Sequence, residues 1–151
     1  MKTNLLFWML ALLLCSVAQA QDLLTALREE IVTVKKPGLF TLELETTLYR
    51  PPGDGPHPLV VINHGKAPGD SRFQPRARYV LAAREFVQRG YAVAIPMRQG
   101  FSKSNGAYVG SGCNVGGNGH AQADDVKQAL EHFAARPDID AFMVATPDHW
   151  H

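Results

Sequence analysis

The central part of the sequence alternates short apolar runs with amphipathic segments, and few folds accommodate that alternation. Residues 59–62, 91–95 and 141–145 are continuous apolar runs, which are typical of strands buried on both faces. Between them, residues 75–89 and 124–136 carry apolar side chains at helical spacing. Because crossovers between parallel strands are right-handed, this order predicts an α/β domain with a mainly parallel sheet and helices on both faces.

Local signals mark the ends of the two predicted helices. The first helix begins with Pro75, which the first turn of a helix tolerates, and ends at Gly90. The second helix has Asp124 and Asp125 in its first turn, where the helix dipole favours carboxylates, and Pro137 ends it.

Two β-rich segments precede the alternation. Residues 29–34 and 39–48 are separated by the turn-forming residues 35–38, so they predict an N-terminal β-hairpin. The prolines and glycines of residues 51–56 predict an exposed loop after the hairpin. A longer loop is predicted at the glycine-rich residues 99–119, and long loops in compact domains are often functional.

The first twenty residues have the pattern of a signal peptide. Lys2 gives a positive start, residues 5–14 form an apolar core, and residues 18–20 (AQA) form a small-residue cleavage site. The apolar core is too short to span a bilayer. The sequence therefore predicts a protein that is exported to the periplasm or secreted, with one domain at residues 21–151 and no membrane contact after cleavage.

The mature region has no charge pattern that would suggest a nucleic-acid or membrane partner. Lys2 is one of 15 Lys and Arg residues, and all 14 Asp and Glu residues lie beyond residue 20, so the mature region carries 14 charges of each sign. Cys113 is the only cysteine after residue 20, which excludes an intramolecular disulfide there. Its thiol is expected to be buried as a small apolar group, to react, or to bridge two molecules.

Three stretches of the mature region have the order and spacing of known family motifs. They are residues 58–65 (PLVVINHG), 89–106 (RGYAVAIPMRQGFSKSNG) and 117–133 (GNGHAQADDVKQALEHF). Together they resemble the first half of the α/β-hydrolases, most closely the dienelactone-hydrolase and prolyl-oligopeptidase-like branch. The resemblance covers about residues 30–140. It implies a partial α/β-hydrolase fold and a small-molecule substrate that is a carboxylic ester or a related acyl compound.

The same resemblance places an oxyanion-stabilising N–H group at Gly65 or Lys66, with His64 beside it. Acyl transfer builds negative charge on the substrate carbonyl oxygen, and one fixed donor stabilises that charge by about 3 kcal/mol. Glycine lets the backbone approach closely and turn sharply. The family's catalytic histidine comes late in the chain, so His64 is not expected to fill that role. The local alternative is that Gly65 only turns the chain and His64 packs against the loop.

The nucleophile motif of the family, G-x-S-x-G, occurs nowhere in the sequence. Ser102, Ser104 and Ser111 each lack at least one of the two glycines that the motif requires, and Asp148 is not a substitute because the residues two positions away from it are not small. No catalytic nucleophile, acid or base can therefore be identified. We expect a truncated α/β-hydrolase-like domain that is inactive as given.

The C-terminal residues 141–151 (AFMVATPDHWH) resemble a segment of the Gfo/Idh/MocA oxidoreductases that lies beside the nicotinamide. The dinucleotide motif G-x-G-x-x-G does not follow an early strand, so no cofactor is predicted. Asp148, His149 and His151 are candidate metal ligands. On a strand only His149 and His151 would point to the same face, and two ligands do not complete a metal site, so no metal is predicted. The alternative to a truncated hydrolase is a non-catalytic or chimeric product with this atypical tail.

In the α/β-hydrolases further strands follow the one that corresponds to residues 141–145. Without them this strand is expected to lie at an edge of the sheet, with apolar surface and unpaired backbone groups exposed. Self-association through this edge is therefore expected.

Overall fold

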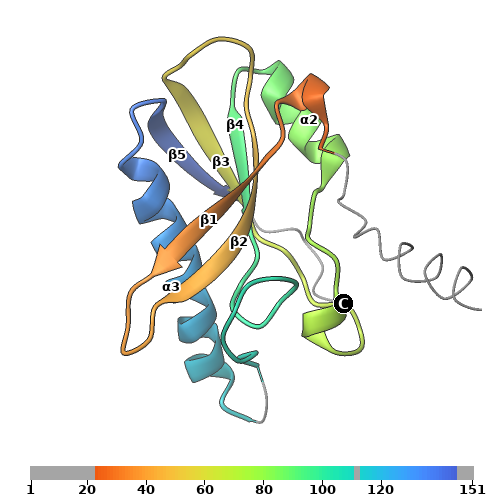
Figure 1. Cartoon of the computed structure of the whole chain (residues 1–151), viewed down its shortest axis with the longest axis vertical. Coiled ribbons are helices and arrows are strands. Elements are labelled where there is room, and N and C mark those ends of the chain that lie inside the picture. The colour runs from red at the N-terminus through yellow and green to blue at the C-terminus, as the bar shows by residue number, and fades with distance from the viewer. Residues whose placement is uncertain (1–22, 111–112, 146–151) are drawn as a thin grey trace, which may run out of the picture.

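Five strands form a single mixed sheet in the computed structural model, which describes residues 23–110 and 113–145 (Figure 1). The strands are β1 (Glu30–Lys36), β2 (Leu42–Tyr49), β3 (His57–Ile62), β4 (Ala92–Pro96) and β5 (Ile139–Ala145), in the spatial order β1-β2-β4-β3-β5. β2 pairs antiparallel with β1 and β4, whereas β4, β3 and β5 run parallel. The predicted hairpin and the parallel sheet are confirmed.

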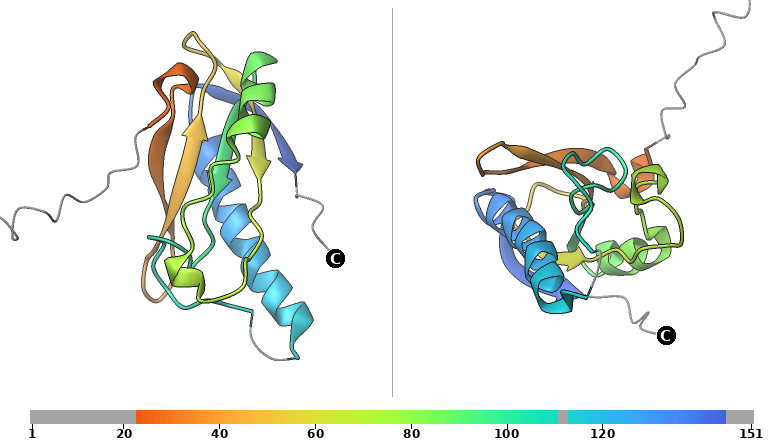
Figure 2. Two further views of the ribbon diagram at one scale, coloured as in Figure 1. Left: turned by 90° about the vertical axis from the view of Figure 1, so that its right-hand side faces the viewer. Right: turned by 90° about the horizontal axis from the view of Figure 1, so that it is seen from below.

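Two helices cover opposite faces of this sheet (Figure 2), α2 (Val80–Gln88) and α3 (Val115–Ala134). Alternate residues of β3 and β4 enter two separate cores, because neighbouring side chains on a strand point to opposite faces. The core under α3 includes Leu59, Val61 and Phe133, and the core under α2 includes Val60 and Val87. This arrangement is a partial α/β-hydrolase fold, as predicted.

Both helices begin at residues other than those predicted. α2 begins at Val80 and not at Pro75, because the buried side chain of Arg76 holds the preceding residues in a non-helical conformation. α3 begins at Val115, where the Asn114 side chain accepts a hydrogen bond of 3.0 Å from the Gly117 N–H. The C-terminal end of the predicted loop 99–119 is therefore helical.

Asp124 and Asp125 are consequently not in the first turn of α3, which was the predicted position. Both residues lie in the middle of α3, and their carboxylates contact the Lys36 Nζ, at 2.8 Å from Asp124 and 2.7 Å from Asp125. They connect α3 to the end of β1 and do not serve the helix dipole.

Several predictions concern residues outside the described part of the chain. These are the signal peptide at residues 1–20, Ser111, and the tail residues 146–151 with Asp148, His149 and His151. Among residues 23–110 and 113–145, no helix combines the length and the apolar character needed to cross a bilayer.

β5 lies at an edge of the described sheet, as expected, and its side chains are only partly covered. Phe142, Met143 and Val144 keep 44%, 47% and 49% of their surface exposed. An edge that combines free backbone groups with apolar side chains favours pairing with another chain.

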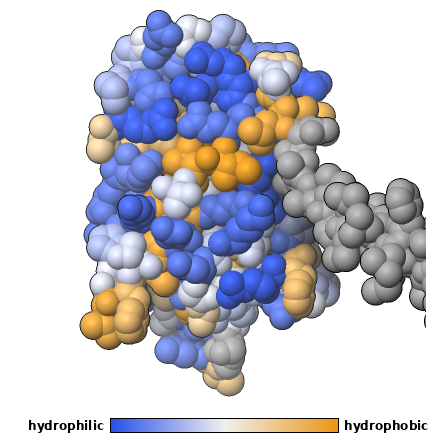
Figure 3. Space-filling view, in the orientation of Figure 1, coloured by the Kyte–Doolittle hydropathy of each residue, from blue (hydrophilic) through white to orange (hydrophobic). Residues whose placement is uncertain are grey.

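We expect the chain without residues 1–20 to self-associate through β5, and Met143→Lys to shift it toward the monomer by placing a charge on that edge. Leu39→Lys is the matched control: Leu39 is 94% exposed in the β1–β2 hairpin turn, and β1 lies at the opposite edge of the sheet from β5. Figure 3 shows an apolar patch at the lower left, where Figure 1 places this turn. Sedimentation velocity over a range of concentrations measures the association. A native chain that stays monomeric throughout would contradict the expectation.

Candidate oxyanion turn and its surroundings

The turn after β3 is organised by the side chain of His64, which is 6% exposed. Its Nε2 accepts a hydrogen bond of 3.0 Å from the Arg98 N–H, so the ring proton is on Nδ1, which donates to the Gly65 carbonyl oxygen at 2.8 Å. The ring also packs edge-on against Phe101, with centroids 4.5 Å apart. Both ring nitrogens are thus engaged in holding the turn.

The imidazole of His64 is neutral at pH values well above 4. Burial lowers the pKa of His64 to about 4, and the nearby Arg98 guanidinium acts in the same direction, while the contact with the Gly65 carbonyl opposes them. A proton added at Nε2 would displace the Arg98 N–H from its acceptor. The histidine therefore maintains the turn in its neutral form.

Arg98 ties the same turn to β4 and α3. Its Nη2 donates to the His64 carbonyl oxygen at 2.9 Å, and its Nη1 donates to the side-chain oxygen of Gln122 on α3. Gln122 in turn donates a hydrogen bond from its Nε2 to the Val109 carbonyl oxygen at 3.0 Å. Sequence analysis did not assign Arg98 a role, although its place directly after a parallel strand was a signal that it lies near the site.

A buried carboxylate supports the segment that carries Arg98. Asp125 is 1% exposed, and its oxygens accept hydrogen bonds from the Lys36 Nζ at 2.7 Å and the Gln99 N–H at 2.9 Å. Burial alone would lower the pKa of Lys36, but its hydrogen bonds with Asp124 and Asp125 outweigh burial and raise it. The charged pair therefore connects β1, α3 and the loop after β4.

Gly65 and Lys66, the predicted oxyanion donors, are exposed beside an open cavity of about 420 Å³. A Cβ atom added at Gly65 would meet no other atom within 4 Å, so there is free space next to this residue. The Gly65 N–H points to the Tyr79 hydroxyl oxygen, 3.4 Å away. The Lys66 side chain folds back onto its own loop and donates to the Gly69 carbonyl at 2.8 Å.

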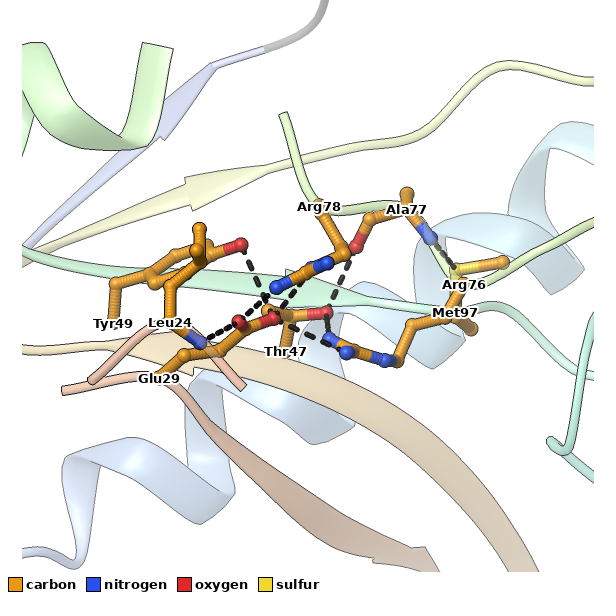
Figure 4. Close-up of polar contacts among 8 residues, drawn as sticks. All are labelled: Leu24, Glu29, Thr47, Tyr49, Arg76, Ala77, Arg78 and Met97. Atoms are coloured by element: carbon orange, nitrogen blue, oxygen red, sulfur yellow. Dashed lines mark hydrogen bonds and ion pairs between the residues drawn. The ribbon is translucent and has the colours of Figure 1, made fainter. Parts of the chain in front are cut away.

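One wall of the cavity is anchored by a charge cluster that sequence analysis missed (Figure 4). Glu29 is fully buried at its carboxylate, which accepts hydrogen bonds from Arg76 Nη2 at 3.1 Å and from Arg78 Nε at 2.7 Å. The Leu24 N–H and the Tyr49 hydroxyl donate to the same carboxylate, at 2.7 and 3.3 Å. Arg76 lines the cavity, so the cluster fixes the backbone that leads into α2.

Burial alone would raise the pKa of Glu29, but the hydrogen bonds from Arg78, Leu24 and Arg76 outweigh it, so the pKa is lowered. The carboxylate is therefore charged at neutral pH and balances one of the two guanidinium groups.

The remaining candidate residues lie away from this turn. Cys113 is exposed, so the expectation of a buried apolar thiol is wrong. His120 is exposed, whereas His132 is half-buried and packs edge-on against Phe133. Burial, followed by the nearby Arg136, lowers the pKa of His132. The described residues contain no group of three His, Cys, Asp or Glu side chains arranged to hold a metal ion.

The solved structures described next have a similar fold and are distant in sequence. Est1E of Butyrivibrio proteoclasticus, solved with ferulic acid bound, has a TM-score of 0.56 at 16% identity, over 76% of this chain and 41% of its own. Acetyl xylan esterase 1 of Thermoanaerobacterium sp. gives 0.54 at 15% identity, over 79% and 40%. The Pyrococcus furiosus esterase Pf2001 gives 0.53 at 21% identity, over 81% and 43%. The chain thus spans about two fifths of the length of these structures, which share its fold.

The sequence comparisons agree with this fold. No curated protein matches the chain. The model of the X-Pro dipeptidyl-peptidase family, S15, matches residues 41–141, which is more than half of the chain and includes β2, β3, α2, β4 and α3. The protein therefore belongs to the X-Pro dipeptidyl-peptidase (S15) family and has the α/β-hydrolase fold.

Proposed function

We propose that this chain is part of an exported hydrolase that acts on carboxylic esters or related acyl compounds. We further propose that its turn at Gly65 and Lys66 supplies backbone N–H groups to the developing oxyanion. The observation that carries the proposal is the rigid turn after β3, which His64 and Arg98 hold in place beside an open cavity. Preorganised donors of this kind stabilise negative charge without reorganising during the reaction. Family membership and the similar esterase structures support an acyl substrate.

The position of the turn in the sheet also supports this chemistry. β3 runs parallel to β5, with Ile62 beside Ala145 at their carboxyl ends. The turn after β3 and the carboxyl end of β5 therefore lie at the same edge of the sheet, where α/β enzymes place their reacting groups. In α/β-hydrolases the nucleophile follows the strand in this position.

We further propose that the 151-residue chain does not turn over substrate, because its sequence contains no G-x-S-x-G. An oxyanion turn without a nucleophile retains only about a thousandfold acceleration over water in serine-protease variants. One observation favours the alternative of a chimeric product: the family match ends at residue 141, where the resemblance to the Gfo/Idh/MocA oxidoreductases begins.

The test starts with the purified chain lacking residues 1–20, incubated with p-nitrophenyl acetate, an X-Pro anilide and a fluorophosphonate label. We expect neither hydrolysis above the buffer rate nor labelling. Covalent labelling of this chain would show that it holds an activated serine and would overturn the proposed inactivity.

The coding region beyond His151 provides the second arm. If a longer product with a G-x-S-x-G motif is encoded there, we expect it to hydrolyse the ester and its Ser→Ala variant to be inactive. A longer product that binds nicotinamide nucleotide and hydrolyses neither substrate would favour the chimera. Amino-terminal sequencing of the protein from the periplasm or medium tests export and cleavage after Ala20.

A further inference from the structure

The turn between β1 and β2 exposes two large apolar side chains that are adjacent in the chain. Leu39 is 94% exposed and Phe40 is 81% exposed. Single apolar residues are common on protein surfaces, whereas neighbouring ones with so little cover are typical of a surface that contacts something else. The turn is therefore a candidate contact surface.

The base of this turn is fixed by other residues. β1 and β2 are paired as far as Lys36, which lies opposite Leu42, and the Lys36 Nζ contacts the buried carboxylate of Asp125 at 2.7 Å. The nearly complete exposure of Leu39 and Phe40 leaves them little contact with the rest of the protein. These two side chains thus add little to the stability of the fold.

Two more exposed apolar side chains lie at the same end of the molecule. Phe73, in the short helix η2 (Ser71–Phe73), is 85% exposed, and Val115, the first residue of α3, is 79% exposed. The β1–β2 turn, η2 and the start of α3 are all at the lower end in Figure 1 and in the left view of Figure 2. The turn and η2 lie on opposite sides of that end in Figure 1. The apolar side chains are therefore carried by three separate segments around one end.

Cations exceed acidic groups among the exposed side chains of this end. In segments 35–43, 65–74 and 98–110 the exposed charged residues are the cations Lys35, Lys66, Arg72 and Lys103 and the acids Glu43 and Asp70. The balanced charge of the region beyond residue 20 conceals this surplus, because folding brings the segments together. Charge counted along the sequence therefore gave no sign of a membrane partner.

An anionic lipid surface fits both properties of this end. It takes up separate apolar side chains at the level of its headgroups, and it attracts Lys and Arg. A protein partner would instead need one contiguous apolar region to form the buried centre of the contact. β1 also lies at the opposite edge of the sheet from β5, so further strands beside β5 leave the turn uncovered.

We propose that this end of the molecule binds the surface of a bilayer that contains anionic lipids, with the β1–β2 turn as its main contact. Leu39 and Phe40 insert among the headgroups, and the exposed cations contact lipid phosphates. The carboxyl ends of β3 and β4 then face the bilayer. This inference concerns binding alone and does not depend on the proposed acyl chemistry.

Flotation with vesicles tests the proposal on the chain without residues 1–20, because vesicles carry bound protein upward while self-associated protein stays behind. Vesicles of phosphatidylcholine and phosphatidylglycerol are expected to bind the chain, and phosphatidylcholine alone to bind it at least about fivefold more weakly. Leu39→Ser combined with Phe40→Ser is expected to lower the partition coefficient about tenfold or more. Leu81→Ser is the matched control: Leu81 is 76% exposed on α2, in the upper half of Figure 1, and a change within about twofold is expected.

A second measurement locates the contact without removing it. The emission of Phe40→Trp is expected to shift to the blue with anionic vesicles and to be quenched by brominated lipid, after subtraction of the native signal from Trp150. The emission of Leu81→Trp is expected to stay unchanged.

Three results would overturn the proposal. The first is a native chain that does not float with anionic vesicles. The second is a double variant that floats like the native chain or that loses no more binding than Leu81→Ser, together with an unshifted emission of Phe40→Trp. The third is a double variant that self-associates less than the native chain in the absence of vesicles while its flotation is unchanged, which would assign the turn to a contact with a second copy of the chain.

Discussion

Replacing Glu29 with glutamine is expected to lower the free energy of unfolding by about 3–5 kcal/mol. The carboxylate of Glu29 is fully buried, and Arg76 beside it has a side chain only 2% exposed. The neutral amide of glutamine leaves both Arg76 and Arg78 without a counter-charge, and it also offers an N–H₂ group where an acceptor is needed. A buried charge that loses its partner costs far more than the intact pair contributes, because the charge cannot recover its hydration.

The matched control is Glu30→Gln, at the neighbouring position. Glu30 pairs with Arg50 at 2.7 Å, but its side chain is 35% exposed, so water compensates for the lost charge. A cost of no more than about 1 kcal/mol is expected there. Urea denaturation at pH 7 of the chain without residues 1–20 measures both variants. If Glu29→Gln costs as little as Glu30→Gln, the cluster does not anchor the segment that leads into α2.

Acidification from pH 6.5 to pH 4 is expected to lower the free energy of unfolding by about 3 kcal/mol through His64 alone. In the unfolded chain the imidazole has its ordinary pKa of 6.5, whereas burial and then Arg98 lower its pKa to about 4 in the folded protein. Over this range the unfolded chain binds a proton that the folded protein does not. The contribution is therefore intact above pH 6.5, and it is lost as the pH falls toward 4.

Two measurements separate His64 from the other titrating groups. The ring signals of His64 are expected to titrate near pH 4 in the folded protein. His64→Gln is expected to be less stable at pH 7 and to lose stability less steeply between pH 6.5 and 4.5, because the contribution of His132 remains. His120→Gln is expected to keep the native pH dependence. A His64 ring that titrates near 6.5 would contradict the assignment.

The strands of the parallel sheet could be predicted closely, because burial on both faces requires only a continuous apolar run. Residues 59–62, 91–95 and 141–145 lie within or next to β3, β4 and β5, which differ from them by two residues or fewer at either end. The edge position of β5 in the described sheet followed from the order of elements in the α/β-hydrolases. The helix starts were wrong where a distant contact or a side-chain cap, and not a proline or an acidic pair, determined the first turn.

The location of the candidate site could be predicted in part. Gly65 and Lys66 were expected at the end of a parallel strand, and the structure places them there beside the cavity. The groups that hold this turn were not predicted, since Arg98 lies 34 residues from His64 in the chain. Tyr79 lies within residues 75–89, which were predicted as a helix with an apolar face, whereas its hydroxyl faces Gly65 at the cavity.

Apolar runs and turn-forming residues act on their immediate neighbours, so they were sufficient to predict the class of fold, the paired strands and the turn after β3, whereas only the resemblance to the α/β-hydrolases suggested an oxyanion role for that turn. The chemistry around that turn depends on distances between atoms that are remote in the chain: Glu29 lies 47 residues from Arg76, and Lys36 lies 89 residues from Asp125. No local pattern specifies such a distance. Only packing of the helices and the hairpin against the sheet brings these charges together, and burial then makes each pair depend on its partner.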